Sequence, residues 1–360
     1  MFVATPRRLL FFVVTSVCVA FAASTVQAEE TLWTTRGASG QLRFSKDGKY
    51  AWSTVPGDTN VIIKENNVWE MPAGTKVSGW QDRASTVFRN FLNDGKHLLQ
   101  IGQAYTETNE ARSEGRVIEL ATGKSILDVD VPSRIISVVV TKDDKVYFFS
   151  IEGVTQFDTK TGEQKLVSDI IASQVAIMPD SGRVLAVMDP LGELQDSVYV
   201  FNSMADFLAK RKPRYKFGPF EVAHVTPAPD DKTIVIRHMA TGNDGLEVES
   251  FTCVDVVRGR RLAQYQLTNP SGIGEPDYFS ADGKWVMTGS PPTITVFNVE
   301  KKEGTPHEDD KTPVGFTPGS ALIMSVYGKP FQFLDPATYQ PLDTPLEEKW
   351  LKVPAKSGRR

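Results

Sequence analysis

A short motif that recurs along the chain constrains the fold more than any other feature of the sequence. Each copy has an apolar run, a turn rich in Asp, Gly and Lys, and a second apolar run, as in LRFSKDGKYAWS from Leu42. Asp-Gly between two apolar runs is a strong hairpin signal, because glycine accepts the positive φ of a tight turn. Seven copies follow one another about every 47 residues, a spacing typical of repeat architectures. Their turn positions are Asp47, Asp94, Asp143, Asp180, Asp230, Asp282 and Pro318.

A second hairpin follows most copies. It has an alternating apolar run, a polar residue, a turn such as Thr-Gly, and another run, as in GRVIELATGKSILDV from Gly115. Two hairpins make four strands, and radial repetition of a four-stranded sheet makes a β-propeller. We therefore predict an all-β chain, a seven-bladed β-propeller of four-stranded antiparallel blades. The degenerate fourth, fifth and seventh copies leave counts of six or eight blades open.

Helical patterning is nearly absent, which excludes folds that need a helix between successive strands. Only residues 202–212 (NSMADFLAKRK) predict a short helix, with Ser203 as its N-cap. A propeller must also close its ring, since an open edge strand promotes aggregation. Either residues 30–36 or residues 340–345 are expected to supply the missing strand of the last blade.

The first 28 residues have the three parts of a secretory signal peptide. Arg7 and Arg8 precede an apolar stretch of about fifteen residues, and a small-residue cleavage site ends at Ala28. We predict a signal peptide at 1–28, one propeller domain at 29–350 and a basic tail at 351–360. The mature protein is expected to be exported, to the periplasm or outside the cell, with no membrane-spanning segment. Its one cysteine, Cys253, lies in a strand-like run and is expected to be a buried small hydrophobe.

The turns FSKDGK at Phe44 and FSADGK at Phe279, with the partner turns ATGK at Ala121 and KTGE at Lys160, resemble those of a known group of repeats. The chain is similar to WD-repeat-like and YVTN-type propellers, including the quinoprotein amine dehydrogenase-like superfamily. The resemblance covers nearly all of the mature chain and implies architecture without naming an activity. No Trp-Asp pair closes the third strand of a unit, so the likeness favours a bacterial-type repeat.

No residues are predicted to be catalytic, cofactor-binding or metal-binding. The four histidines are scarce and scattered: His97 and His307 are expected to be solvated, while His224 and His238 flank one hairpin beside Arg237 without a third ligand. With one mature cysteine a haem attachment motif is excluded, and neither a phosphate-binding loop nor a serine-nucleophile motif is present.

Charge excludes one class of partner. The formal net charge is −4, and both signs are scattered along the chain, so no basic stripe suits nucleic acid. The one locally basic and aromatic run is KRKPRYKFGPF from Lys210, which suits an anionic partner or a cell-envelope polymer. Two polar segments, GNDGLEVE from Gly242 and EGTPHEDDK from Glu303, are expected to be solvated loops that could form a binding face.

These observations favour a non-enzymatic binding or scaffold propeller for a protein or envelope ligand. Two alternatives stay open. One is a lactonase-like hydrolase, with carboxylates and Asn gathered at the ring centre from separate blades. The other is a subunit that supports a separate redox protein.

Overall fold

The structure is a computed structural model that describes residues 31–37, 41–45, 47–57, 60–82, 85–105, 111–132, 134–188, 195–241, 247–267, 278–326 and 328–352. The predicted signal peptide lies outside the described residues, as do residues 353–360 of the predicted tail. Within the described ranges, no helix has the length and apolar character to cross a membrane.

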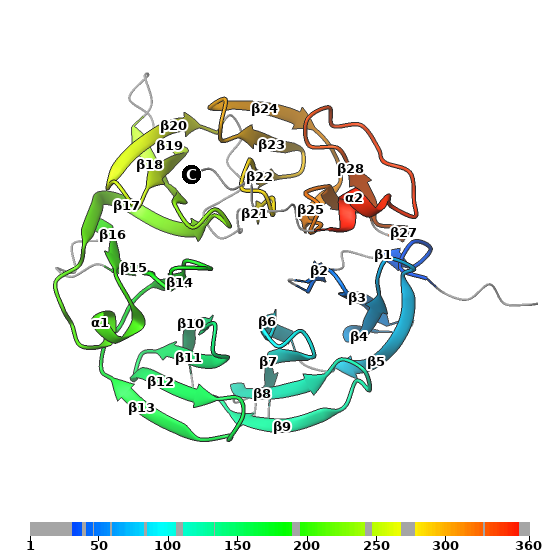
Figure 1. Cartoon of the computed structure of the whole chain (residues 1–360), viewed down its shortest axis with the longest axis horizontal. Helices are drawn as coiled ribbons and strands as arrows, with labels where there is room; N and C mark the ends of the chain where they lie inside the picture. The colour runs from blue at the N-terminus through cyan, green and yellow to red at the C-terminus, as the bar shows by residue number, and fades with distance from the viewer. Residues whose placement is uncertain are drawn as a thin grey trace, which may run out of the picture.

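The described chain is all-β and built from antiparallel sheets that stand around a common centre (Figure 1). The first sheet contains β2 (Leu42–Phe44), β3 (Tyr50–Gly57), β4 (Asn60–Glu70) and β5 (Thr75–Asp82). The second contains β6 (Ser85–Phe91), β7 (His97–Tyr105), β8 (Ala111–Glu119) and β9 (Ser125–Asp130). The third contains β10 (Ile135–Val140), β11 (Lys145–Ser150), β12 (Gly153–Asp158) and β13 (Gln164–Ser168).

A seven-stranded sheet comes next along the chain. It consists of β14 (Gln174–Ile177), β15 (Val184–Met188), β16 (Gln195–Phe201), β17 (Tyr215–Pro227), β18 (Thr233–Thr241), β19 (Glu247–Asp255) and β20 (Arg260–Gln266). The long strand β17 joins its two parts, because residues 215–221 pair with β16 and residues 221–227 pair with β18. β17 therefore ends one four-stranded group and begins the next.

Two further sheets complete the ring in Figure 1. One contains β21 (Tyr278–Phe279), β22 (Trp285–Ser290), β23 (Thr293–Asn298) and β24 (Glu303–Glu308), and the other contains β25 (Thr312–Phe316), β26 (Leu322–Ser325) and β28 (Gln332–Leu334). In each of the sheets β2–β5, β6–β9 and β10–β13, the first strand lies nearest the centre of the ring and the fourth lies outermost. Apolar side chains fill the space between neighbouring sheets, as Trp52, Val68, Leu98 and Leu120 do between the first and second.

All seven copies of the hairpin motif form antiparallel pairs, which confirms the predicted hairpins. The pairs are β2 with β3, β6 with β7, β10 with β11, β14 with β15, β17 with β18, β21 with β22, and β25 with β26. Gly48 and Gly95 have φ values of 70° and 66°, the left-handed conformation that the Asp-Gly turn requires. The polar segment at 303–308, expected to be a loop, is instead strand β24, because its backbone pairs with β23 along its length.

The predicted helix at 202–212 is shorter than expected. α1 spans Met204–Leu208, and the Ser203 hydroxyl caps it by accepting a hydrogen bond from Asp206 N at 3.1 Å. Its apolar side chains, Met204 and Phe207, are buried against the third and fourth groups of strands. The positive φ of Lys210, 54°, ends the helical path before residue 212.

Both proposed closing segments contribute to the junction between the last sheet and the first. Pro341 bridges to Leu334 of β28, so the C-terminal segment lies beside that strand, as one alternative predicted. β1 (Arg36–Gly37) pairs with β27 (Lys329–Pro330), so the N-terminal segment also reaches the last part of the ring. The short helix α2 (Glu348–Leu351) covers the junction, and Trp350 O accepts a hydrogen bond from Gly319 N at 2.9 Å. Because Leu351 is buried in the apolar cluster there, the folded body extends past the predicted boundary at 350.

Candidate functional site

Side chains on the innermost strands hold neighbouring groups of strands together. Gln174 of β14 donates from Nε2 to Val225 O at 2.8 Å and accepts from Val225 N at 2.7 Å, so its amide is used on both sides. Ser137 of β10 makes the equivalent contacts with Val175, at 3.1 and 3.3 Å. The polar positions near the centre are therefore engaged in linking β10 to β14 and β14 to β17.

His224 lies on β17 beside this link. Its Nε2 atom is 3.2 Å from Gln174 Nε2. Arg237 of β18 is its cross-strand partner and is fully buried. Burial lowers the pKa of His224, and the positive charge of Arg237 lowers it further, so the imidazole is neutral at pH 7. A neutral His224 carries no positive charge with which to attract an anion, and its Nε2 is already used by Gln174.

Glu249 neutralises the charge of Arg237. The Arg237 Nε group pairs with Glu249 Oε1, and Glu249 is only 1% exposed on strand β19. The expectation that Glu249 belongs to a solvated loop is wrong, because the β18–β19 pairing continues through it and draws it under the next sheet. The rest of that predicted loop, residues 242–246, lies outside the described residues.

The other histidines do not join this cluster. His238 faces the opposite side of β18, where its ring contacts Thr252 Oγ1 at 2.9 Å and stacks near Phe220 at 4.6 Å. His97 and His307 are only partly exposed, so the expectation that both are solvated is wrong. His97 binds Asp94 Oδ2 at 2.5 Å, and His307 stacks on Tyr339 at 3.7 Å. Across the described ranges, no group of three or more His, Cys, Asp or Glu residues has the arrangement of a metal site.

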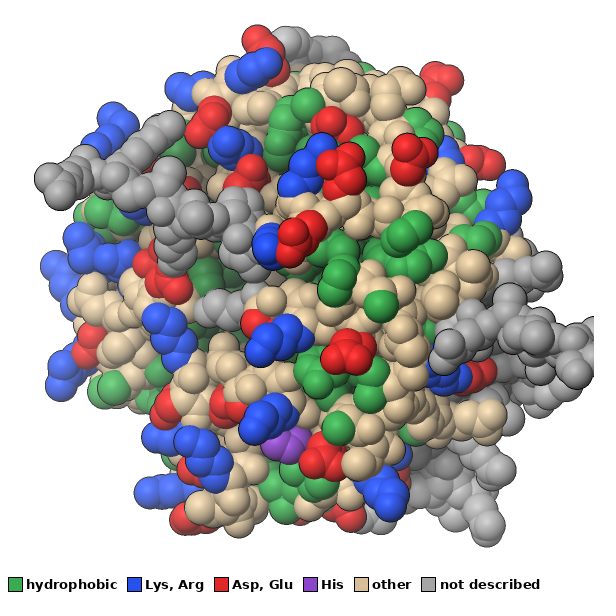
Figure 2. Space-filling model, turned by 45° about the vertical axis from the view of Figure 1, so that its right-hand side comes forward, with side chains coloured by type: hydrophobic (Ala, Val, Ile, Leu, Met, Phe, Trp, Pro, Cys, Tyr) green, Lys and Arg blue, Asp and Glu red, His purple; other side chains and the backbone are tan. Residues whose placement is uncertain are grey.

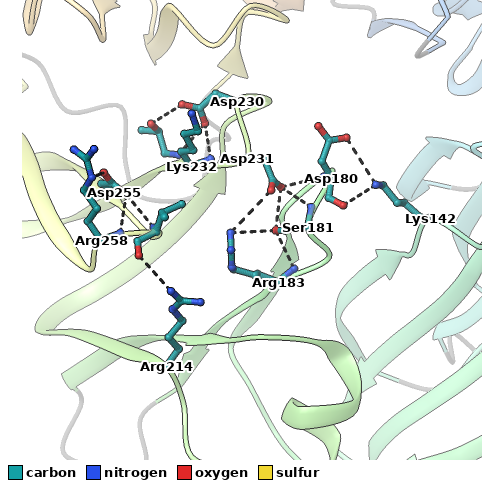
Figure 3. A network of polar contacts seen from close by, with 12 residues as sticks. Lys142, Asp180, Ser181, Arg183, Arg214, Asp230, Asp231, Lys232, Asp255 and Arg258 are labelled. Atoms are coloured by element: carbon teal, nitrogen blue, oxygen red, sulfur yellow. Dashed lines mark hydrogen bonds and ion pairs between the residues drawn. The ribbon is translucent and has the colours of Figure 1, made fainter. Parts of the chain in front are cut away.

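The turns of the hairpin motif bind one another around one face of the ring. Asp144, Asp231 and Ser320 replace the turn glycine in three copies and take positive φ values of 61°, 60° and 74°. Each accepts a backbone N–H from the preceding copy, from Asn93 at 2.7 Å, Asp180 at 3.0 Å and Asp282 at 3.3 Å respectively. Figure 3 shows Asp231 between the Asp180–Ser181 turn and Arg183. The acidic residues of the motif therefore stabilise contacts between sheets.

This turn face has little net charge of its own. Lysine follows the turn aspartate in most copies and forms exposed ion pairs with it, such as Lys49 with Asp47 at 3.7 Å and Lys284 with Asp282 at 4.0 Å. On the side of the molecule shown in Figure 2, Lys and Arg side chains are interspersed with Asp and Glu. Neither sign dominates that part of the surface.

Positive charge gathers instead on the outside of the ring, where the α1–β17 connection meets the β19–β20 turn. The ring of Tyr215 packs against Gly259 so closely that a Cβ atom at residue 259 would lie 2.4 Å from Tyr215 Cε1. The Tyr215 hydroxyl donates a hydrogen bond to Val257 O at 3.0 Å. Arg214 also reaches Val257 O, at 3.5 Å (Figure 3). We call the exposed cations of these two segments the basic edge: Lys210, Arg211, Lys212, Arg214, Lys216, Arg258, Arg260 and Arg261.

Only the first part of the basic edge is recognisable in the sequence, as the basic run from Lys210. The run Arg258–Arg261 lies more than forty residues away in the chain, and nothing in the sequence indicates that the two runs meet. The glycine at 259 is the residue that allows the two runs to touch, because any Cβ there would collide with Tyr215. The basic edge is thus a product of how β17 and the β19–β20 turn pack.

Comparisons with known proteins indicate the fold alone. No protein-family profile and no curated protein sequence matches this chain. Among solved structures, hydrazine synthase of Kuenenia stuttgartiensis is similar with a TM-score of 0.56 and 13% identity, covering 89% of this chain and 98% of that one. An uncharacterised protein of Listeria monocytogenes has a TM-score of 0.56 and 10% identity over 87% of this chain and 97% of its own. A eukaryotic initiation factor has a TM-score of 0.50 and 14% identity over 84% and 86%. Together with the ring of antiparallel sheets, these similarities indicate a β-propeller-like fold.

Proposed function

We propose that this chain is an exported, seven-bladed β-propeller that acts as a non-enzymatic binding or scaffold module. Its ligand, a protein or a component of the cell envelope, binds at the basic edge. The proposal assigns the propeller to the WD-like or YVTN-like repeats and assigns no cofactor.

The seven-blade count is supported by the hairpins and by β17. Seven motif hairpins pair as expected, and dividing the seven-stranded sheet at residue 221 yields two groups of four strands that share β17. The last group has three strands and a bridge from Pro341 to Leu334, which supports a fourth strand supplied by the C-terminal segment.

The basic edge is the observation that carries the binding function. Five of its eight cations, Lys212, Arg214, Lys216, Arg260 and Arg261, form no ion pair with any carboxylate in the described part of the chain. Unpaired exposed charge gathered on one surface of a protein with net charge −4 attracts an oppositely charged partner. By contrast, Gln174 on an innermost strand binds the backbone of Val225, and Glu249 is buried and paired with Arg237, so these polar groups serve contacts between strands and favour the binding function over channel chemistry of the lactonase type.

Binding of the mature chain to the envelope fraction of the cells that produce it tests this proposal. We expect the wild-type protein to sediment with washed envelopes and the variant K212Q/R214Q/R260Q to remain in the supernatant. The matched control K49Q/K96Q/K284Q removes three lysines of the turn face and should sediment like wild type. Retention of the first variant on envelopes, or absence of wild-type binding, would refute the proposed function.

A further inference from the structure

We propose that the basic edge recognises a phosphate-bearing polymer chain, and this proposal rests on the proposed function. The ligand class follows from the kind of cations present, from their surroundings and from their spread over two chain segments. Each of these is a property of described residues.

Arginine dominates the basic edge. Five of its eight cations are arginines: Arg211, Arg214, Arg258, Arg260 and Arg261. Guanidinium groups present paired N–H donors whose geometry matches two oxygens of one phosphate, and they lose less hydration than an ammonium group does. The exposed fractions of Arg211 and Arg258, 72% and 67%, leave their donors accessible to a ligand.

The acidic residues nearby neutralise only part of this charge. Asp169 pairs with Lys210 at 2.7 Å, Asp206 with Arg211 at 2.8 Å, and Asp255 with Arg258 at 3.9 Å. These lie beside the segments that carry the cations, so they hold individual side chains in place, while the charges of the other five cations are not neutralised by a carboxylate of the described residues. Of these five, Arg214 and Arg261 donate to Val257 O and Gln264 Oε1, and Lys216 lies over the Tyr199 ring. The lowered pKa of Asp169, caused by its hydrogen bond to Lys210, is consistent with such a pair.

The surroundings disfavour a protein partner. Cores of protein–protein interfaces are enriched in aromatic side chains, Met and Arg and depleted of Lys, Asp and Glu, so a protein partner would need exposed apolar side chains beside these arginines. Among the described large hydrophobic residues that are exposed, Val257, at 36%, is the one located here, whereas the other six lie between residues 77 and 171. The basic edge therefore offers charge with little apolar surface.

The spread of the cations over two chain segments disfavours a small ligand. The basic edge runs from the connection after α1 to the outermost strand β20, over the outside of the ring (Figure 1). A single small anion would contact only a few of these cations. A flexible chain with repeated phosphate groups can follow the basic edge and contact several cations at once, in the manner of backbone contacts to nucleic acids.

Titration with labelled inorganic polyphosphate, in the mature full-length protein, tests the ligand class. We expect K212Q/R214Q/R260Q to bind roughly 10- to 100-fold more weakly than wild type at low salt, with the slope of log Kd against log salt reduced by about two. The control K49Q/K96Q/K284Q should keep both values. The variant K212R/R214K/R260K keeps the charge but exchanges two guanidinium groups for ammonium groups, so it should bind more weakly than wild type and more tightly than K212Q/R214Q/R260Q. Equal melting temperatures will verify that all variants fold.

Four outcomes would overturn the inference. Polyphosphate binding that is unchanged in K212Q/R214Q/R260Q would show that the basic edge is not the site. Stronger binding to phosphatidylglycerol vesicles than to polyphosphate would assign a lipid surface, and stronger binding to polyglutamate would assign an acidic polypeptide. If the same variant loses envelope binding but wild type ignores polyphosphate, the ligand class is wrong while the proposed function stands.

Discussion

Replacement of Arg237 by Met should be among the most destabilising single changes in this protein. Arg237 is fully buried, and its ion-pair partner Glu249 is 1% exposed. Glu249 Oε2 has no hydrogen-bond partner among the residues that the structure describes, so Arg237 provides most of the compensation seen there for burying this carboxylate. Removing one member of a buried pair costs about 3–5 kcal/mol, because the other charge remains buried without a partner.

A double-mutant cycle separates that cost from simple loss of packing. Met is as long as Glu and shorter than Arg, but it is unbranched and bulkier than Glu, so R237M/E249M removes both charges while the summed side-chain volume changes little. We expect each single variant to lose about 3–5 kcal/mol of unfolding free energy and the double variant to be at least about 2 kcal/mol more stable than the sum predicts.

Urea unfolding at pH 7, followed by tryptophan fluorescence and by far-ultraviolet circular dichroism, measures these values. Agreement of the two probes is needed, since a ring of many sheets can unfold in more than one step. Strictly additive losses, or a loss below about 1 kcal/mol in R237M, would refute the argument that burial of an unpaired charge controls this site.

Three further changes have defined expected outcomes. Burial lowers the pKa values of His224, His238 and His307 in the folded protein. Their contribution to stability is therefore complete above about pH 6.5, the pKa of an unperturbed histidine, and is lost as the pH decreases through the lowered pKa values of the folded state. The urea concentration at the unfolding midpoint should therefore decrease as the pH is lowered from 7.5 to 5.0. A midpoint that stays constant over this range would contradict the prediction. G259A should cost at least about 2 kcal/mol in thermal unfolding, because φ is +66° and the Cβ would meet the Tyr215 ring. D231A should cost about 2 kcal/mol, since it loses the bonds from the 180–181 turn and strains a left-handed residue. D231N keeps an acceptor and should lose less; equal losses in the two variants would refute that account.

Local chemistry in the sequence was sufficient to locate the hairpins and α1. Asp-Gly turns, β-branched runs and the Ser203 cap each act over a few residues, so their effect is readable from the chain. The same reasoning misplaced the segments at 249 and 303–308, because their polar residues resemble loops. Strand pairing overrode that composition: Glu249 is buried with a distant arginine, and residues 303–308 extend the edge of a sheet.

The candidate site was likewise only partly predictable from the sequence. The run from Lys210 was visible as a basic segment, but its continuation through Arg258–Arg261 depends on the contact between Tyr215 and Gly259. Likewise, the motif aspartates looked like parts of isolated turns, whereas Asp144 and Asp231 bind the turn of the preceding copy. The repeat period gives the spacing of the copies along the chain, but it does not show which side chains of neighbouring copies meet.

The sequence by itself therefore determined the repeated hairpin, the nearly complete absence of helix and the position of the capped helix, because each of these depends on short-range backbone preference. Only the tertiary structure decided how the ring closes, with residues from both ends at its junction, and which charges are paired. It also decided where the cations without a carboxylate partner gather. Electrostatic and packing contacts act through space, so they join residues that lie far apart in the sequence.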